Sequence, residues 1–286
     1  MLNLNDLRIF AAVAQEESIS RAALRLHYVQ SNVTARVRGL EDQLGVSLLH
    51  RRGRGVSLSP QGRVLLEHAE RLLALAELAE RSVRETDGPA GPLRLGSMET
   101  TAALRLPDIL ARYCQRHPGV ALHVTTGTTH ELLEQVLAHR LEAALVDGPV
   151  EHAELAASPV FDEELVLARA EGADVSSALL VFRRGCSYRA RFEGWLREEG
   201  RLPYRIMEMG TLEGILGCVA AGLGQTLLPR PVFHGRAGIV LSPVPDHVGR
   251  VRTQLVRRAD VPPCSALAAL LALLSERDRE PAAGRV

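Results

Sequence analysis

Residues 18–45 read SISRAALRLHYVQSNVTARVRGLEDQLG, and two short helical patterns within them decide the fold of the N-terminal region. Ser20 is placed to cap the first predicted helix. Its inward face consists of Ala22, Ala23 and Leu26. A turn at residues 27–28 leads to a second predicted helix, whose apolar face consists of Val33, Val37, Leu40 and Leu44. The spacing of these residues predicts two helices that pack on one core.

The opposite face of the second predicted helix is polar in an unusual way. It carries Gln30, Ser31, Thr34, Ala35 and Arg38. A helix that is only solvated typically shows more glutamate and fewer hydroxyl groups. Side-chain amides and hydroxyls on an exposed helix can instead pair with base edges in the major groove of DNA.

The segments on either side extend this pattern. A preceding helix is predicted from the spacing of Leu7, Phe10, Ala11 and Ala14, with Asn3 or Asn5 as its cap. After Gly45, alternating residues flank a tip rich in glycine and arginine, which predicts a two-stranded wing over residues 46–58. Arg51, Arg52 and Arg54 at that tip can reach backbone phosphates.

Charge is distributed unevenly along the chain. The 286 residues have no net charge, and all 34 basic residues are arginine. Residues 1–66 nevertheless hold nine arginines against five acidic residues. A basic end on an otherwise acidic chain predicts a polyanionic partner for that end.

Five motif fragments occur in order within about fifty residues. They are Leu7-x-x-Phe10, Ser18-Ile19-Ser20-Arg21-Ala22-Ala23-x-x-Leu26, Gln30-Ser31-x-x-Thr34, Leu40-Glu41-x-x-Leu44-Gly45 and Arg51-x-x-Arg54. Together they resemble the LysR-type transcriptional regulators. The resemblance implies a winged helix-turn-helix in which Gln30, Ser31, Thr34 and Ala35 face bases, while Arg51 and Arg54 hold phosphate.

Three positions depart from the family pattern, and one alternative fold remains open. Val29 stands where a capping Ser or Thr is usual, Leu49 replaces a usual Phe, and Ala35 replaces a longer polar residue. These departures affect which DNA bases the second predicted helix would read, and they leave the predicted fold unchanged. Arg36 is as well explained by solvation as by phosphate contact. The alternative to DNA binding is a three-helix module that binds protein.

A long helix is predicted after the wing. Ser59-Pro60 is a cap followed by proline, and residues 61–85 then carry an apolar stripe flanked by charged residues. Such a helix usually buries its stripe against a second copy of itself, and the alternative is packing on its own chain. Residues 87–92, rich in glycine and proline, predict a linker.

Strands and helices alternate in the remainder of the chain. Strands are predicted at residues 93–96, 120–125 and 143–146, with a helix through residues 104–113 and another at 130–138. A second unit begins at Phe161, with strands at 164–168, 178–182, 205–209 and 225–229 and helices at 188–198 and 212–221. This alternation predicts a mostly parallel sheet covered on both faces.

Hydroxyl side chains follow the first two of these strands. They are Ser97, Thr100 and Thr101 after the first, and Thr126, Thr128 and Thr129 after the second. Ligands bind at the carboxyl ends of parallel strands, and hydroxyls beside helix starts suit a carboxylate or sulfate. For any single residue, helix capping explains the hydroxyl equally well.

The family resemblance extends to this C-terminal region, where residues 220–229 read AAGLGQTLLP. It implies an effector domain similar to periplasmic binding proteins, with two α/β lobes and a ligand cleft between them. Thr211 would then face the first lobe across the cleft. The chain would return to the first lobe near residues 252–257 and end as a helix through Leu273.

The four cysteines are far apart and form no C-x-x-C pair, so neither a metal site nor a disulfide framework is predicted. Arginines flank Cys186 and could lower the pKa of its thiol. A regulator that senses oxidants through Cys186, with Cys218 as a partner thiol, therefore remains an alternative.

Other functional classes find less support. The sequence contains no G-x-S-x-G, H-E-x-x-H or phosphate-binding loop motif, which argues against an enzyme and against any required cofactor. A solute-binding protein for a transporter would need export, and no signal peptide or membrane span is recognisable. We therefore expect a cytoplasmic protein.

The sequence thus predicts an α/β protein with an all-α winged helix-turn-helix at its N-terminus. The expected parts are a DNA-binding domain at residues 1–58, a linker and dimerisation helix at 59–87, and an effector-binding domain at 88–286. Lobe I would comprise residues 93–160 and 252–280, and lobe II residues 161–251. The expected partners are promoter DNA, a small anionic effector and one or three further copies of the chain, with RNA polymerase as a further candidate.

Overall fold

The computed structural model describes residues 1–52, 55–84, 88–172, 178–201 and 205–278. The chain divides into two compact units, residues 1–84 and residues 85–286 apart from the short stretch 138–140. Each unit is built around its own buried side chains.

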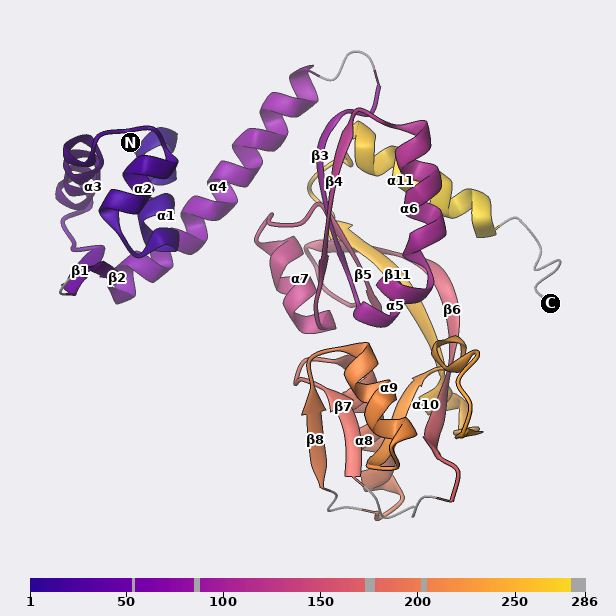
Figure 1. The fold of residues 1–286 in the computed structure, drawn as a ribbon. Coiled ribbons are helices and arrows are strands. Elements are labelled where there is room, and N and C mark those ends of the chain that lie inside the picture. The colour runs from indigo at the N-terminus through magenta and orange to yellow at the C-terminus, as the bar shows by residue number, and fades with distance from the viewer. Residues whose placement is uncertain (53–54, 85–87, 173–177, 202–204, 279–286) are drawn as a thin grey trace. The chain divides into compact units, whose positions relative to one another are not determined.

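The N-terminal unit begins with three helices, as the sequence predicted (Figure 1): α1 (Leu4–Glu16), α2 (Ile19–Arg25) and α3 (Gln30–Leu44). Asn3 caps α1 by accepting from the backbone N–H of Asn5. The predicted cap of α2 was wrong, because Ser18 rather than Ser20 accepts from the backbone N–H of Arg21. Ser20 lies inside the helix, since the chain already turns at Glu17 in the left-handed conformation, with φ of 48°.

The core of this unit forms where α1, α2 and α3 meet. Val13 and Val33 have no exposed surface there, and Ala22 is equally buried. Phe10 is also fully buried, in a second cluster that includes Leu40 and Ala69. Leu44 was predicted to face this core but is 38% exposed. It is the last residue of α3, where its side chain is only partly covered.

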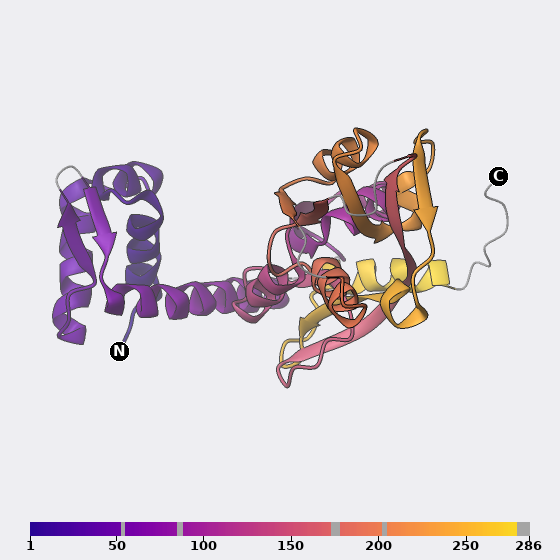
Figure 2. The same ribbon diagram turned by 90° about the horizontal axis from the view of Figure 1, so that it is seen from below.

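The predicted wing is a hairpin of β1 (Leu49–Arg52) and β2 (Gly55–Leu58), paired antiparallel with Leu49 opposite Leu58. The hairpin and the helices beside it are visible in Figure 2. The long helix α4 (Pro60–Arg84) follows, and it packs along α1. Ser59 fixes its start, since its Oγ accepts from the backbone N–H of Gly62 at 2.9 Å.

Lobe I of the C-terminal unit contains β3 (Gly91–Ser97), β4 (Val120–Thr126) and β5 (Ala143–Asp147). β3 lies between β4 and β5 and is parallel to both. α6 (Leu106–Arg116) and α11 (Ser265–Asp278) lie side by side on one face, while α7 (Thr129–Leu137) packs against β5 on the other (Figure 1).

One helix predicted in lobe I is divided in two. α5 (Glu99–Leu104) has Arg105 as its C-cap, and α6 starts at Leu106 with Pro107 in its first turn. Proline lacks a backbone N–H and clashes with the carbonyl four residues earlier. A helix that runs without a break from α5 into α6 is therefore excluded, and Leu104 of the predicted helix belongs to α5.

Lobe II contains β7 (Ala178–Phe182), with β8 (Ile206–Met209) and β9 (Gly224–Pro229) parallel on either side of it. Its helices are α8 (Ser187–Glu198), α9 (Leu212–Ala220) and the short α10 (Asp246–Gly249), with a 3-10 turn η1 (Arg230–Phe233). β10 (Ile239–Ser242) pairs antiparallel with β6 (Leu155–Ala170).

Two long strands connect the lobes. β6 and β11 (Arg250–Arg258) are antiparallel to each other. β11 also pairs with β5 of lobe I, and β6 also pairs with β9 of lobe II. The prediction of a mostly parallel sheet is thus correct for β3–β5 and β7–β9 but wrong for these connections. A chain that leaves lobe I and returns to it must run in both directions, so its two crossings are antiparallel.

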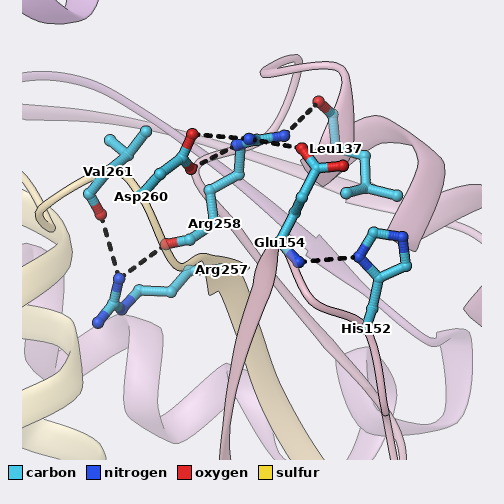
Figure 3. Close-up of polar contacts among 7 residues, drawn as sticks. All are labelled: Leu137, His152, Glu154, Arg257, Arg258, Asp260 and Val261. Atoms are coloured by element: carbon cyan, nitrogen blue, oxygen red, sulfur yellow. Dashed lines mark hydrogen bonds and ion pairs between the residues drawn. The ribbon is translucent and has the colours of Figure 1, made fainter.

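An arginine at the end of β11 anchors α7 (Figure 3). Arg258 forms ion pairs with Glu154 at 2.8 Å and with Asp260 at 2.7 Å, and its Nη1 donates to the carbonyl of Leu137, the last residue of α7. A cation at a helix C-terminus satisfies free carbonyl groups and complements the helix dipole. α7 is therefore held in place at its C-terminal end.

Candidate functional site

The polar face of α3 is available at the surface of the N-terminal unit. Gln30, Ser31, Ala35, Arg36 and Arg38 are exposed, and Thr34 is partly buried. On the opposite face of the helix, Val33, Val37 and Leu40 are buried in the core. Because the N-terminal residues of a recognition helix reach base edges, this surface has the arrangement that groove reading requires.

Local contacts orient three of these side chains. Ser20 Oγ donates to Gln30 Oε1 at 3.1 Å, and Thr34 Oγ1 donates to the carbonyl of Gln30 at 2.9 Å. Arg36 forms an ion pair with Asp6 of α1 at 3.1 Å, although 47% of its side chain stays exposed. Arg36 would therefore have to exchange Asp6 for a phosphate in order to bind DNA.

Asn32 is a candidate that the sequence analysis did not consider. It lies in the first turn of α3 and is exposed. An asparagine in the first turn of a predicted recognition helix was the available signal, since its amide can pair with adenine. Of the wing residues, the side chain of Arg51 and the whole of Arg54 lie outside the described residues, so their predicted phosphate contacts stay predictions.

A cavity of about 150 Å³ lies between the two lobes of the C-terminal unit. Lobe I contributes residues 98–100 and 126–129 to its lining, from the carboxyl ends of β3 and β4. Lobe II contributes Phe182, Arg183, Cys186, Tyr188, Met209 and Gly210, from the end of β7, the start of α8 (Ser187–Glu198) and the end of β8. The cavity thus lies where the strands of both lobes end, as expected for α/β folds.

The predicted effector residues divide into two groups. Thr100, Thr126 and Thr128 line the cavity. Ser97, Thr101 and Thr211 do not appear in its lining. Ser97 and Thr101 are buried within lobe I, and the exposed Thr211 instead caps α9 by accepting from the backbone N–H of Gly214 at 3.1 Å.

Two charged residues of the lining were missed from the sequence. Glu99 Oε1 accepts from the backbone N–H of Leu212 at 2.7 Å, which connects lobe I to the start of α9 in lobe II. Arg183 Nη2 donates to Glu131 Oε2 at 2.7 Å, which connects β7 of lobe II to α7 of lobe I. The signal for Arg183 was its place directly after a predicted strand, where only hydroxyl side chains had been considered.

Glu131 also helps to cap the N-terminus of α7. Its Oε2 accepts from the backbone N–H of Thr128 at 2.9 Å, and its own backbone N–H donates to Thr128 Oγ1 at 3.3 Å. This reciprocal arrangement is a capping box. The Thr128 hydrogen bond, and then Arg183, lower the pKa of Glu131 from its ordinary value. Glu131 is therefore held as a carboxylate.

Comparison with known proteins now decides the family. A family model for bacterial regulatory helix-turn-helix proteins of the lysR family matches residues 4–63, and a model for the LysR substrate binding domain matches residues 86–279. The chain belongs to the LysR family. It is a DNA-binding transcriptional regulator with a substrate-binding domain, and it is not an enzyme.

Relatives of this LysR-type regulator match along nearly its whole length. The transcriptional regulator GltR of Bacillus subtilis is 43% identical over 281 residues, which cover 94% of this chain and 95% of GltR. YofA of Bacillus subtilis is 41% identical and covers 96% of this chain and 99% of YofA.

Solved structures agree with the fold. Full-length OxyR from Pseudomonas aeruginosa superposes with a TM-score of 0.71 at 25% identity, over 96% of this chain and 95% of OxyR. CbnR in complex with its target DNA gives a TM-score of 0.70 at 25% identity, over 96% of this chain and 99% of CbnR. The fold predicted from the sequence is thereby confirmed.

The cysteines of this LysR-type regulator are all free thiols. Cys186 lines the cavity, but burial raises the pKa of its thiol, and the nearby Asp147 acts in the same direction. Burial also raises the pKa of the neighbouring Tyr188 hydroxyl. A buried thiol with a raised pKa forms little reactive thiolate, so the environment of Cys186 does not favour the oxidant-sensing alternative.

Within the described ranges of this LysR-type regulator, no three His, Cys, Asp or Glu side chains are grouped so that they could hold a metal ion. No described helix is both long enough and apolar enough to cross a membrane.

Proposed function

We propose that this regulator binds promoter DNA as a homo-oligomer through residues 1–58 and responds to a small ligand with a carboxylate or similar anionic group. Residues 59–87 would join the subunits, and residues 88–286 would hold the ligand between lobe I (93–160 and 252–280) and lobe II (161–251). Because its target is chromosomal DNA, it would act in the cytoplasm.

The observation that carries the proposal is the surface of α3. Its apolar side is buried against α1 and α2, while its exposed side presents Gln30, Ser31 and Asn32 in the first turn. Amides and hydroxyls at these positions can pair with base edges. Arg38 on the same exposed side is placed to contact phosphate, which positions the protein without reading sequence.

Assembly is supported by α4. In the isolated chain, Val64, Leu72 and Leu75 are 58%, 42% and 46% exposed. A long helix with an unshielded apolar stripe gains stability when it pairs with a second copy. Two recognition helices could then meet two half-sites. Whether two such dimers join into a tetramer, and whether RNA polymerase contacts the complex, would be decided by titration on the promoter.

Ligand binding is supported by the cavity between the lobes. Thr100 and Thr126 offer hydroxyls there, and Arg183 offers a cation from the opposite lobe. A ligand held by both lobes would stabilise their closed arrangement relative to an open one. The change in the C-terminal unit would then alter the spacing or bending of the bound DNA.

The first experiment measures binding of the full chain to DNA fragments that flank its own gene, over a salt series. We expect tight binding that weakens steeply with salt, because phosphate contacts release counterions. Gln30→Ala should cost about 1–3 kcal/mol of binding free energy on the specific site. Gln43→Ala, an exposed glutamine at the far end of α3, is the matched control and should have no effect.

Two results would contradict the proposal. Absence of binding to every genomic fragment at low salt would remove the groove-reading function of α3. A ligand that occupies the cavity but leaves both the DNA footprint and transcription from the target promoter unchanged would remove the sensing function. Binding that survives Gln30→Ala but fails in Arg38→Ala would indicate phosphate contact without sequence reading.

A further inference from the structure

Among the described residues that line the cavity between the lobes, Glu99 is the acidic one. Glu99 begins α5 in lobe I and is half-buried. Its bond to the backbone N–H of Leu212 uses Oε1. A carboxylate has two oxygens with about four lone-pair sites, so Glu99 retains the capacity to accept from a ligand while it holds Leu212.

The opposite lobe supplies the complementary charge. Arg183 follows β7, lines the same cavity, and has a side chain that is 51% exposed. Its bond to Glu131 uses Nη2. A guanidinium group carries five N–H donors in a planar fork, so Arg183 can bind a second carboxylate without releasing Glu131.

These two charges restrict the ligand. In a cavity of about 150 Å³, a ligand with only a carboxylate would bind near the negative charge of Glu99, and like charges repel each other. A ligand with only an ammonium group would in the same way be repelled by the positive charge of Arg183. A ligand that carries both groups satisfies both side chains.

The rest of the lining suits the body of such a ligand. Thr100 and Thr126 add hydroxyl groups on the side of Glu99, while Met98, Phe182 and Met209 form apolar surface. Small-molecule sites commonly combine apolar walls with a few placed polar groups. The volume favours a small ligand with a short side chain.

We propose that the ligand of this cavity is a free amino acid or a similar small zwitterion, whose ammonium group binds Glu99 and whose carboxylate binds Arg183. The inference rests on the proposed function, in which this cavity is the effector site. Because Glu99 belongs to lobe I and Arg183 to lobe II, the bound zwitterion connects the lobes beside hydrogen bonds that already join them, among them those of Glu99 and Arg183.

The test is calorimetric titration of the full chain with the twenty standard amino acids, 4-aminobutyrate and 5-aminovalerate. Each ligand that binds is then compared with its counterparts that lack one charge, which for alanine are propionate and ethylamine. We expect at least one amino acid to bind, and each single-charge counterpart to bind about tenfold more weakly or worse. Failure of every zwitterion, or equal binding of the carboxylate counterpart, overturns the inference.

Two variants separate the roles of the charges. Glu99→Gln keeps an oxygen that can accept from Leu212, and it should weaken amino-acid binding roughly ten- to a hundredfold without weakening the carboxylate counterpart. Arg183→Gln should weaken both ligands. General unfolding would lower the affinity for both ligands in either variant. Only the contrast between Glu99→Gln, which should leave carboxylate binding intact, and Arg183→Gln, which should not, supports the inference. Glu276→Gln and Arg116→Gln, at a surface ion pair between α11 and α6, are the matched controls.

The outcomes also separate this inference from the proposed function. A simple carboxylate that binds in an Arg183-dependent manner, with no amino acid binding, overturns the inference and leaves the anionic effector site intact. Unchanged amino-acid affinity in Glu99→Gln likewise overturns it. If neither class binds, the cavity is not the effector site, and both the inference and that part of the proposed function fail.

Discussion

Gly62 offers a sharp test of the packing described for the N-terminal unit. It lies in the first turn of α4, and replacing a helical glycine with alanine normally stabilises a protein by about 0.5–1 kcal/mol. At this position a Cβ atom would stand 2.1 Å from the carbonyl oxygen of Leu48 and 3.1 Å from Leu58 Cδ2. We therefore expect Gly62→Ala to destabilise the unit.

The magnitude follows from what must move. The contact with Leu48 has to lengthen from 2.1 Å to at least 3.0 Å, and the obstructing atom is backbone. That oxygen accepts from the backbone N–H of Ser59 at 2.9 Å, and Ser59 Oγ in turn holds the N–H of Gly62. Overpacking of this kind costs about 1–3 kcal/mol, and loss of a cap about 1 kcal/mol. After subtraction of the helix gain, a net loss of about 1–3 kcal/mol remains.

The matched control is Gly39→Ala in α3. A Cβ atom there has no neighbour within 4 Å, so the ordinary gain of about 1 kcal/mol is expected. Both variants are measured by hydrogen exchange of α1 amides around Phe10 in the full chain, because Phe10 is buried in this unit. Protection should fall roughly five- to 150-fold in Gly62→Ala and rise in Gly39→Ala. An equal rise in both variants would refute the packing argument.

Three further predictions concern other parts of the molecule. The Thr128 hydrogen bond lowers the pKa of Glu131 below 4.5. Glu131→Gln should therefore reduce thermal stability above about pH 4.5, and this loss of stability should vanish as the pH falls through the lowered pKa. A loss that persists at lower pH would contradict this. Iodoacetamide should label the exposed Cys114 faster than Cys186, whose thiol pKa is raised by burial, and peptide mass spectrometry would reveal equal rates if the burial argument is wrong. Leu75→Asp on α4 should shift the protein toward monomer and weaken DNA binding; an unchanged sedimentation coefficient would exclude the α4 interface.

Most elements of the fold could be predicted from local patterns. Helical spacing and the polar face located α3, and the Ser59-Pro60 pair located the start of α4. Alternation around a glycine- and arginine-rich tip located the wing. These signals are visible in sequence because caps, turns and amphipathic faces depend on residues only a few positions apart.

The predictions from sequence were wrong where the structure or burial of a residue depends on segments far away in the chain or on individual neighbouring residues. The first half of β6, residues 155–163, was not predicted as strand, because it is held by β11 about ninety residues later. Leu44 follows the helical period but is 38% exposed, because the end of α3 is only partly covered by the rest of the unit.

The effector cavity shows the same division most clearly. The sequence by itself determined that hydroxyl side chains follow β3 and β4, and Thr100, Thr126 and Thr128 do line the cavity. Only the tertiary structure decided that Ser97 turns inward and that Glu99 and Arg183 line one cavity from opposite lobes. The reason is physical: strand ends are fixed by local pattern, whereas the neighbours of a charged side chain are fixed by the pairing of strands far apart in the chain.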